Sequence, residues 1–179
     1  MKKYELTEET FTVFGKTLYR IRAVRDFGSV KTGEFGGYIE KEENLSHFGN
    51  AWISGDAWVY GDARVYGDAR VFDNAWISGD ARVYGDARVF GNARVFGNAE
   101  VFNTRHFFVQ GPIGSRDGYV TFYRTKDDTV EVRCGCFSGS LQEFVNQVEE
   151  THGGSRYEKE YKLAAELAKV CIRLEGESR

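Results

Sequence analysis

Nine consecutive six-residue repeats run through the centre of the chain, from Gly49 to Phe102, and limit its possible folds more than any other feature. Every repeat contains an alanine followed two residues later by Ile or Val, and Asp or Asn stands before each alanine. Residues two apart point to the same side of an extended strand, whereas Gly-Asp and Gly-Asn favour turns. Each repeat therefore predicts a short strand with two inward side chains, followed by a corner.

The repeats predict a solenoid, because one hexad cannot bury its inward side chains alone. Three hexads can close one triangular coil, and coils that stack about 4.8 Å apart pair every backbone strand. The nine hexads give about three coils. Ile39 and Leu45 continue the alanine spacing and predict part of an earlier coil. His47 falls in the valine column and is predicted to point into that coil.

Outward-facing residues stack one coil apart in this arrangement. The three predicted columns are Trp58–Trp76–Arg94, Trp52–Arg70–Arg88 and Arg64–Arg82–Glu100. Stacked arginines repel one another, so we expect them to meet acids of the repeats or of another subunit, the candidates within the repeats being Asp62, Asp68, Asp80 and Asp86. Two tryptophans on one outer face form a large apolar surface, which favours an oligomer contact. The alternative is that the tryptophans pack only on an N-terminal cap.

Shorter regions flank the solenoid, which gives three predicted domains at residues 1–38, 39–103 and 104–179. In the first, Phe11–Phe14 and Leu18–Val24 surround a Gly15-Lys16 turn and predict a β hairpin. Because the terminal coil of a solenoid needs a cover, we expect this hairpin to cap the open end.

The C-terminal region is predicted to be a small α+β domain of order β-β-β-α-α. Its three strands fall at residues 106–110, 119–124 and 130–136. Ser140 and Glu143 form a capping box that opens a helix ending at Gly153, and a second helix follows from Tyr157 to Leu174. Helical spacing predicts that this second helix buries Tyr161, Ala164, Leu167, Ala168, Cys171 and Ile172.

The uninterrupted GNA and GDA hexads resemble the hexapeptide-repeat family. That resemblance implies a mainly β chain built on a left-handed parallel β-helix. It also implies a trimer packed along the helix axis, for which we expect an interface at Trp52, Trp58, Trp76 and Arg94. With its GGYIEKEENLS leader and the IGSR, TFYR and CGCF segments of its tail, the whole chain is similar to hexapeptide-repeat proteins of bacteria and phages. This second resemblance implies an architecture and no particular activity.

Composition argues against several classes of protein. The 24 Lys and Arg and 27 Asp and Glu give a net charge of −3, spread along the chain, which disfavours general binding to nucleic acid or membrane surfaces. No run approaches the roughly 18 apolar residues of a transmembrane helix, and the N-terminus lacks the apolar segment of a secretory signal. Three cysteines, an odd number, fit a reducing cytoplasm better than a disulfide framework.

The histidines fit neither enzyme chemistry of hexapeptide-repeat proteins. The acyltransferases of that family use a histidine on a projecting loop, whereas residues 49–102 contain neither a loop nor a histidine. The γ-class carbonic anhydrases hold zinc with three histidines at a trimer interface, but His47, His106 and His152 lie in different regions without that spacing. We therefore assign no catalytic residue and expect no cofactor; acyl transfer is kept as an alternative.

A zinc site is an alternative reading of the cysteines. Cys134 and Cys136 share a face of a predicted strand, and with His152 and Cys171 they offer four ligand atoms for a tetrahedral site. The spacing is not that of a standard zinc finger, and buried free cysteines are common. We expect these cysteines to be core residues.

Two glycine-bearing turns predict an anion site in the C-terminal domain. GPIGSRDG, residues 111–118, carries an arginine, and GCFSGS, residues 135–140, leads into a helix N-terminus whose N–H groups favour anions. The predicted contacts are Arg116, Arg124, Arg133, Ser138, Gly139 and Ser140, with further charge from Lys126. The alternative is two ordinary turns and a well-capped helix.

These observations together predict a non-catalytic, cytoplasmic homotrimer. Its solenoid is a rigid core, and its C-terminal domain is expected to bind a small anionic ligand such as a nucleotide, which a phage-type protein would use to sequester a host signal. Recruitment of a protein partner through exposed aromatic side chains is the alternative function.

Overall fold

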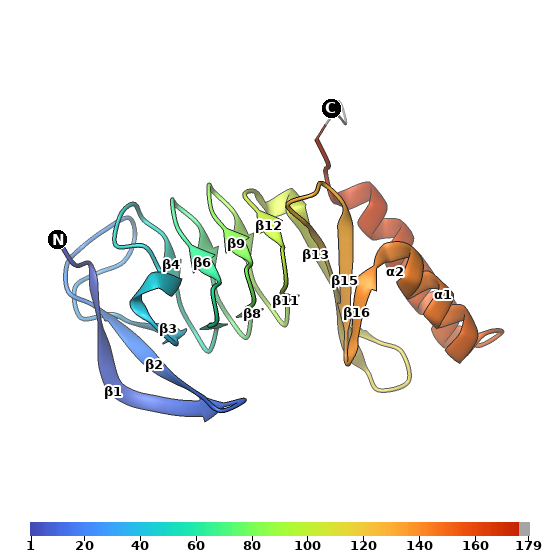
Figure 1. The fold of residues 1–179 in the computed structure, drawn as a ribbon, viewed down its shortest axis with the longest axis horizontal. Helices are drawn as coiled ribbons and strands as arrows, with labels where there is room; N and C mark the ends of the chain where they lie inside the picture. Colours follow the sequence, from blue (N-terminus) through green and yellow to red (C-terminus); the bar gives the residue numbers. More distant parts are fainter. Residues whose placement is uncertain (176–179) are drawn as a thin grey trace.

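The centre of the chain is a β-solenoid of about four turns, seen from the side in Figure 1. The computed structural model describes residues 1–175. The coils stack along the long axis of the molecule, with a hairpin at one end and a sheet backed by two helices at the other.

Nine two-residue strands form the repeat coils, one in each hexad. They are β4 (Trp52–Ile53), β5 (Trp58–Val59), β6 (Arg64–Val65), β7 (Arg70–Val71), β8 (Trp76–Ile77), β9 (Arg82–Val83), β10 (Arg88–Val89), β11 (Arg94–Val95) and β12 (Glu100–Val101). Strands three apart pair in parallel, so that Trp52 lies opposite Arg70, eighteen residues on. All nine repeat alanines and all nine Ile or Val residues are at most 1% exposed, which confirms the predicted inward pattern. The three predicted outward columns also form.

The leader before the repeats adds the fourth turn, in a different register from the predicted one. Strand β3 (Phe35–Ile39) places Ile39 opposite Val59, and Leu45 lies opposite Val65, so both belong to the valine column. Paired residues of this turn and the next are twenty positions apart instead of eighteen. The two extra residues lie between Ser46, whose N–H bonds to the Val65 carbonyl, and Asn50, whose N–H bonds to the Gly67 carbonyl. The prediction that Ile39 and Leu45 continue the alanine column was therefore wrong.

His47 lies in this irregular corner and does not point into the coil as predicted. Its ring is half-buried and stacks on Tyr4 at 4.3 Å between centroids. Its Nδ1 accepts the Lys3 backbone N–H at 3.3 Å. A short 3-10 helix, η1 (Glu42–Asn44), precedes the corner. His47 therefore packs at the end of the solenoid, beneath the N-terminal strand.

A bent hairpin covers the N-terminal end, as predicted. Strands β1 (Tyr4–Val13) and β2 (Lys16–Ala23) pair antiparallel, and β2 continues the sheet β3-β5-β8-β11. Leu6 pairs with Ile21 but Thr10 with Tyr19, so β1 carries two extra residues, which bend the hairpin along the solenoid. The Phe14 ring at its tip stacks on Trp76 at 5.4 Å.

The C-terminal sheet has four antiparallel strands, one more than predicted. They are β13 (Phe107–Ile113), β14 (Gly118–Arg124), β15 (Val130–Cys134) and β16 (Phe137–Ser140), after the 3-10 helix η2 (Thr104–His106). The extra strand, β16, lies in the segment predicted to be a turn before the first helix. Strand β13 likewise continues through Gly111 and Pro112, so that the turn predicted at residues 111–118 begins only after Ile113.

This sheet joins two hydrophobic cores, because strand residues alternate between its faces. Phe107 and Tyr123 close the core of the solenoid. Phe122 and Val132 face the two helices, which cover the far side of the sheet in Figure 1. The C-terminal region therefore caps the second end of the solenoid.

The first helix begins at its predicted cap, and the second begins within one residue of the expected start, with Ser155 as its N-cap. Helix α1 (Leu141–His152) has the Ser140–Glu143 capping box, and helix α2 (Arg156–Cys171) ends a few residues earlier than expected. Ala164, Ala168 and Ile172 are buried, but Leu167 is 46% exposed, so its predicted burial was wrong. Leu167 lies on the face of α2 that points away from the sheet. No helix among residues 1–175 is long and apolar enough to span a membrane.

Candidate functional site

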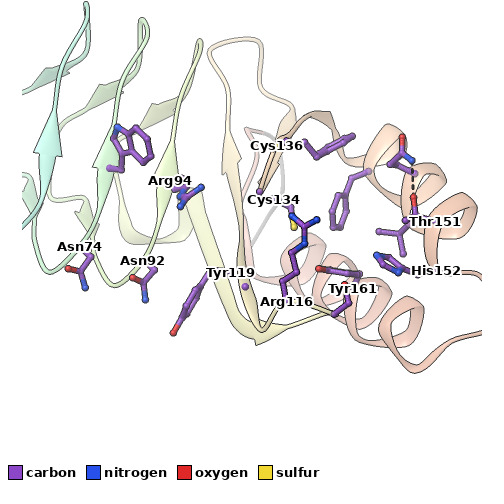
Figure 2. Close-up of a pocket in the computed structure, with 18 of the residues that line it drawn as sticks. Asn74, Asn92, Arg94, Arg116, Tyr119, Cys134, Cys136, Thr151, His152 and Tyr161 are labelled. Atoms are coloured by element: carbon purple, nitrogen blue, oxygen red, sulfur yellow. Dashed lines mark hydrogen bonds between the residues drawn. The ribbon is translucent and has the colours of Figure 1, made fainter. Parts of the chain in front are cut away.

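The interdomain groove is a cavity of about 980 Å³ between one face of the solenoid and the C-terminal domain (Figure 2). Its solenoid wall consists of two stacked columns, the corner residues Asp56, Asn74 and Asn92 and the strand residues Trp58, Trp76 and Arg94. The opposite wall combines the β13–β14 turn, the β15–β16 turn and the inner faces of α1 and α2. Residues from five parts of the chain therefore meet in one hollow.

Arg94 projects from the last coil into the groove. Its guanidinium lies over the Trp76 ring, 5.3 Å from the centroid. Its backbone N–H donates to the Thr121 Oγ1 at 2.9 Å, which fixes the sheet against this edge of the solenoid. The side chain is exposed and forms no ion pair with any residue of the described chain, 1–175. Its charge is therefore available to a ligand.

Arg116 lies on a turn that is tied to α2. The Gly114 N–H donates to Glu160 Oε2 at 2.7 Å. Gly114 has a φ of +75°, and a Cβ there would stand 1.9 Å from the Tyr161 hydroxyl, so only glycine allows this close approach. Figure 2 shows the Arg116 side chain running toward Cys134. Within residues 1–175 this arginine also forms no ion pair.

Cys134 and Tyr161 form a neutral polar pair between the two arginines. Both side chains line the same part of the groove and influence each other's pKa. Burial raises the pKa of the Cys134 thiol, against the opposing effects of Tyr161 and Arg94. Burial also raises the pKa of Tyr161 to about 12, and Arg116 acts in the opposite direction. Arg94 and Arg116 thus act electrostatically on the same pair, from opposite walls of the groove.

The remaining lining is aromatic and mostly uncharged. His152 stacks on Tyr161 with 5.7 Å between ring centroids, and Tyr119 is 42% exposed at the mouth of the groove. Among the described residues, Asp56 is the one carboxylate that lines it. The groove therefore combines two arginines with flat apolar surfaces and little opposing charge.

The structure places Arg124 outside this site, against the prediction that it contacts a ligand. Its side chain is 3% exposed and pairs with Asp128 at 2.7 Å, Glu175 at 2.9 Å and Glu100 at 3.4 Å. The Glu175 backbone N–H and the Arg124 guanidinium hold the pKa of Asp128 below its usual range. Arg124 therefore joins the last coil, the sheet and the C-terminal segment, and has no free face for an anion.

The predicted anion site at the start of α1 is already filled by the protein. The Glu143 carboxylate accepts the backbone N–H and the hydroxyl of Ser140, both at 2.8 Å. These hydrogen bonds lower the pKa of Glu143. A Cβ on Gly139 would lie 2.8 Å from the same carboxylate, and Ser138 is an exposed residue of β16. An external anion would meet a negative charge here, so this part of the prediction was wrong.

Arg133 and Lys126 also lie outside the groove. The Arg133 guanidinium stacks on Phe96, 4.8 Å from the ring centroid, and its buried Nε has no hydrogen-bond partner among the described residues. Lys126 is exposed in the β14–β15 turn, where its backbone N–H donates to the Asn98 carbonyl. Of the predicted anion contacts, only Arg116 lines the cavity.

The four candidate zinc ligands are divided between two places. Cys134, Cys136 and His152 line the groove, whereas Cys171 lies at the end of α2. Within residues 1–175 no three His, Cys, Asp or Glu side chains gather closely enough to hold a metal ion. The arrangement therefore does not fit the zinc alternative. Cys136 is exposed, contrary to the prediction of core cysteines.

The tryptophans expected at an oligomer interface are partly covered by the chain itself. Trp52 is 1% exposed and packs edge-on against Phe27 beneath the hairpin, so it offers no outer surface. Trp58 contacts Phe11 at 4.7 Å between centroids, and Trp76 contacts Phe14. Trp58, Trp76 and Arg94 form one column as predicted, and this column is a wall of the groove.

The solenoid arginines do not meet the repeat aspartates as expected. Within residues 1–175, the ion pair of Asp62 is with Lys41 at 2.8 Å, and Asp68 accepts a hydrogen bond from Asn50. Arg70 donates to the Ser29 hydroxyl at 3.0 Å. Within the described residues, these aspartates and Arg70 therefore bond to side chains of adjacent coils or of the cap, and not to one another.

Sequence reasoning did not identify Asn74, Asn92, Tyr119 and Tyr161 as groove residues. One signal was present, since positions 56, 74 and 92 stack one coil apart beside the tryptophan column. The tyrosines gave no such signal, because they reach the solenoid only through docking of the C-terminal sheet.

Comparison with known proteins bears on the solenoid alone. A repeat family described as the YdcK beta solenoid repeat matches residues 63–79 and 87–101. Both segments lie inside the coils, and the chain is similar to that repeat there. No curated protein matches the chain. Sequence comparison and structure therefore agree on a β-solenoid repeat protein.

Proposed function

We propose that this β-solenoid protein is a binding module for a small anionic ligand that carries a flat ring, such as a mononucleotide. One observation supports the proposal above the others: Arg94 and Arg116 approach the Cys134–Tyr161 pair from opposite walls of a single groove. Each arginine lacks a carboxylate partner within residues 1–175. The site differs from the predicted one at the start of α1, although Arg116 belongs to both.

The chemistry of the groove suits such a ligand. A guanidinium binds a phosphate or carboxylate through two parallel hydrogen bonds, and its affinity rises where water is excluded. Tyr119, which is 42% exposed, offers an aromatic surface for a ring. The volume of about 980 Å³ lies at the upper end of the range of small-molecule sites, roughly 300–1,000 Å³.

Calorimetric titration with adenosine monophosphate tests the proposal. Because each arginine supplies a charge-assisted contact, Arg94→Gln and Arg116→Gln should each weaken binding about tenfold or more. Arg88→Gln is the matched control, since Arg88 is an exposed strand arginine of the same coil on another face. Equal affinity in both groove variants and the control would show that the anion binds elsewhere. Inorganic phosphate in a parallel titration separates recognition of the anion from that of the ring.

We further propose that the solenoid is left-handed, that it belongs to the hexapeptide-repeat type and that it forms a homotrimer in the cytoplasm. The uninterrupted hexads support the first two statements, and three unbridged cysteines support a reducing compartment. Since the hairpin covers part of the tryptophan column, the outer arginine columns are the larger free faces for self-association. Native mass spectrometry tests the trimer, and a monomer mass would remove it.

A scaffold for a protein partner is the second candidate function. Its supporting observation is the outer stripe of α2, where Leu163, Leu167 and Val170 are 70%, 46% and 82% exposed. These residues follow one another at helical spacing on one face. Leu167→Glu should abolish partner binding and leave nucleotide binding unchanged, which separates the two functions.

A further inference from the structure

We infer that Cys134 and Cys136 are a dithiol–disulfide pair that exchanges with a small disulfide bearing carboxylates. This inference rests on the proposed function, because the arginines of the groove would bind the carboxylates. The site is the β15–β16 turn, and both cysteines line the groove together with Arg94 and Arg116.

The geometry of the turn brings the two cysteines close together. Cys134 pairs with Phe137, so that Gly135 and Cys136 form the two central residues of a tight hairpin turn. Gly135 has a φ of +56°, which a glycine adopts without strain. The Cα atoms of two residues with one residue between them, such as Cys134 and Cys136, are less than about 7.6 Å apart even in an extended chain. A turn shortens this distance. Disulfides form at Cα separations of about 4.4–6.8 Å.

The two thiols differ in access, which assigns their order of reaction. Cys136 is exposed at the mouth of the groove, where a small disulfide can reach it. Cys134 is partly buried, so it is less accessible to an incoming molecule and reacts after Cys136. Both cysteines and Arg116 line the same groove. Cys136 is thus the attacking thiol and Cys134 the resolving thiol.

The reaction balances as two successive exchanges. The Cys136 thiolate attacks one sulfur of the small disulfide, forms a mixed disulfide and releases one small thiolate. The Cys134 sulfur, after losing its proton to solvent, attacks Cys136, forms the Cys134–Cys136 bond and releases the second thiolate. The two protein protons end on the two small thiols. The protein dithiol is oxidised and the small disulfide is reduced.

Positive charge at the groove selects among such disulfides. Fixed charges at a site raise the encounter rate of an oppositely charged reactant by roughly tenfold to a thousandfold. Glutathione disulfide carries four carboxylates, whereas hydroxyethyl disulfide is uncharged. At Cys136, the rate with glutathione disulfide is divided by the rate with hydroxyethyl disulfide. The same ratio is measured for a short cysteine peptide, and the difference between the two ratios gives the contribution of the groove.

Intact-mass analysis after reaction with glutathione disulfide is the experiment. The wild-type chain should lose two hydrogens, and peptide mapping should find the bond between Cys134 and Cys136. Cys134→Ser keeps a hydroxyl beside Tyr161 and should trap one glutathionyl group on Cys136. Cys136→Ser should react about tenfold or more slowly, and Cys171→Ser, which removes the cysteine outside the groove, should behave as wild type.

The outcomes separate this inference from the proposed function. If Arg116→Gln abolishes the preference for the anionic disulfide, both stand. If the bond forms without such a preference, the inferred substrate class is wrong. If adenosine monophosphate binds as proposed but no Cys134–Cys136 bond forms at any glutathione disulfide concentration, the thiol inference fails and the binding proposal stands. Reaction of Cys171 alone also overturns the inference.

Discussion

Individual polar side chains satisfy the backbone at both ends of the solenoid. From Ala69 on, each repeat alanine carbonyl accepts a backbone N–H from the preceding coil, as Ala69 does from Trp52. The first coil of repeats has no full coil before it. Its alanine carbonyls accept instead from the Lys3 Nζ, the Tyr38 N–H and the Asn44 Nδ2. Because the Lys3 and Asn44 side chains are buried, replacing either one leaves an unpaired carbonyl.

His106 has the corresponding position at the other end. Its ring is 4% exposed and lies 4.0 Å from Phe102, and its Nδ1 accepts the Phe102 N–H at 3.4 Å. Burial first, and the charge of Arg124 second, lower the pKa of His106 to about 4. The histidine is therefore neutral in the folded chain at pH values where an unfolded chain protonates it.

This difference predicts a loss of stability in mild acid. The folded pKa of His106 is below the unfolded value of 6.5, so its contribution is complete above pH 6.5 and is lost as the pH falls toward 4. His106→Gln should flatten the fall in melting temperature between pH 6.5 and 4.5 relative to wild type. An equal fall in melting temperature between pH 6.5 and 4.5 in wild type and His106→Gln would contradict the prediction.

At the scale of elements, the β1–β2 hairpin is more than an end cap. It extends the sheet that carries Trp58 and Trp76 and bends over both rings. The bend comes from the two extra residues of β1 between Leu6 and Thr10. The N-terminal element thereby borders a site that is otherwise built from the solenoid and the C-terminal domain.

Phe14→Ala tests the contact at the hairpin tip. Loss of the stacked pair with Trp76 should lower the free energy of unfolding by about 0.5–1.5 kcal/mol, because Phe14 itself is largely exposed. Tryptophan emission should also shift to longer wavelength as water reaches Trp76. Phe48→Ala, at an 82% exposed position, is the control and should change neither quantity. An unchanged emission spectrum in Phe14→Ala would show that the hairpin does not cover the ring in solution.

The elements differ in how well the sequence predicts them. The period of six fixes which residues point inward over nine hexads, so the coil core and the outward columns were predicted correctly. The prediction failed at Ile39 and Leu45, because two extra residues before Asn50 shift the register. At the start of α1, the sequence held the decisive signal in Ser140 and Glu143. A capping box brings a carboxylate to the N–H groups that an anion would use.

At the scale of the whole molecule, one buried arginine joins three regions. Arg124 on β14 pairs with Glu100 of the last coil, Asp128 of the next turn and Glu175 near the C-terminus. It also lies over the Phe102 ring, 5.0 Å from the centroid. The groove depends on this docking, because one wall belongs to the solenoid and the other to the C-terminal sheet and helices. No local sequence pattern predicts how the C-terminal sheet and helices dock on the solenoid, and the groove was therefore not predicted.

Arg124→Met should therefore destabilise the docked arrangement. Removing Arg124 leaves Glu100, Asp128 and Glu175 without their shared cation, and it also removes the contact with the Phe102 ring. The expected result is a lower denaturation midpoint, together with weaker nucleotide binding in the groove. Arg82→Met is the control, because Arg82 is exposed and without an ion pair among residues 1–175. Equal midpoints for the two variants would contradict the assigned role.

Because the repeat register is fixed, the solenoid of this chain can become longer or shorter only by whole coils. Each coil adds eighteen residues and one strand spacing of about 4.8 Å, so that removing residues 55–72 would leave every inward position in phase. The hairpin tip, however, has a fixed reach and would fall one rung further along, on Arg94 instead of Trp76. The number of coils can therefore change without disturbing the core, but only one number places the hairpin tip on Trp76.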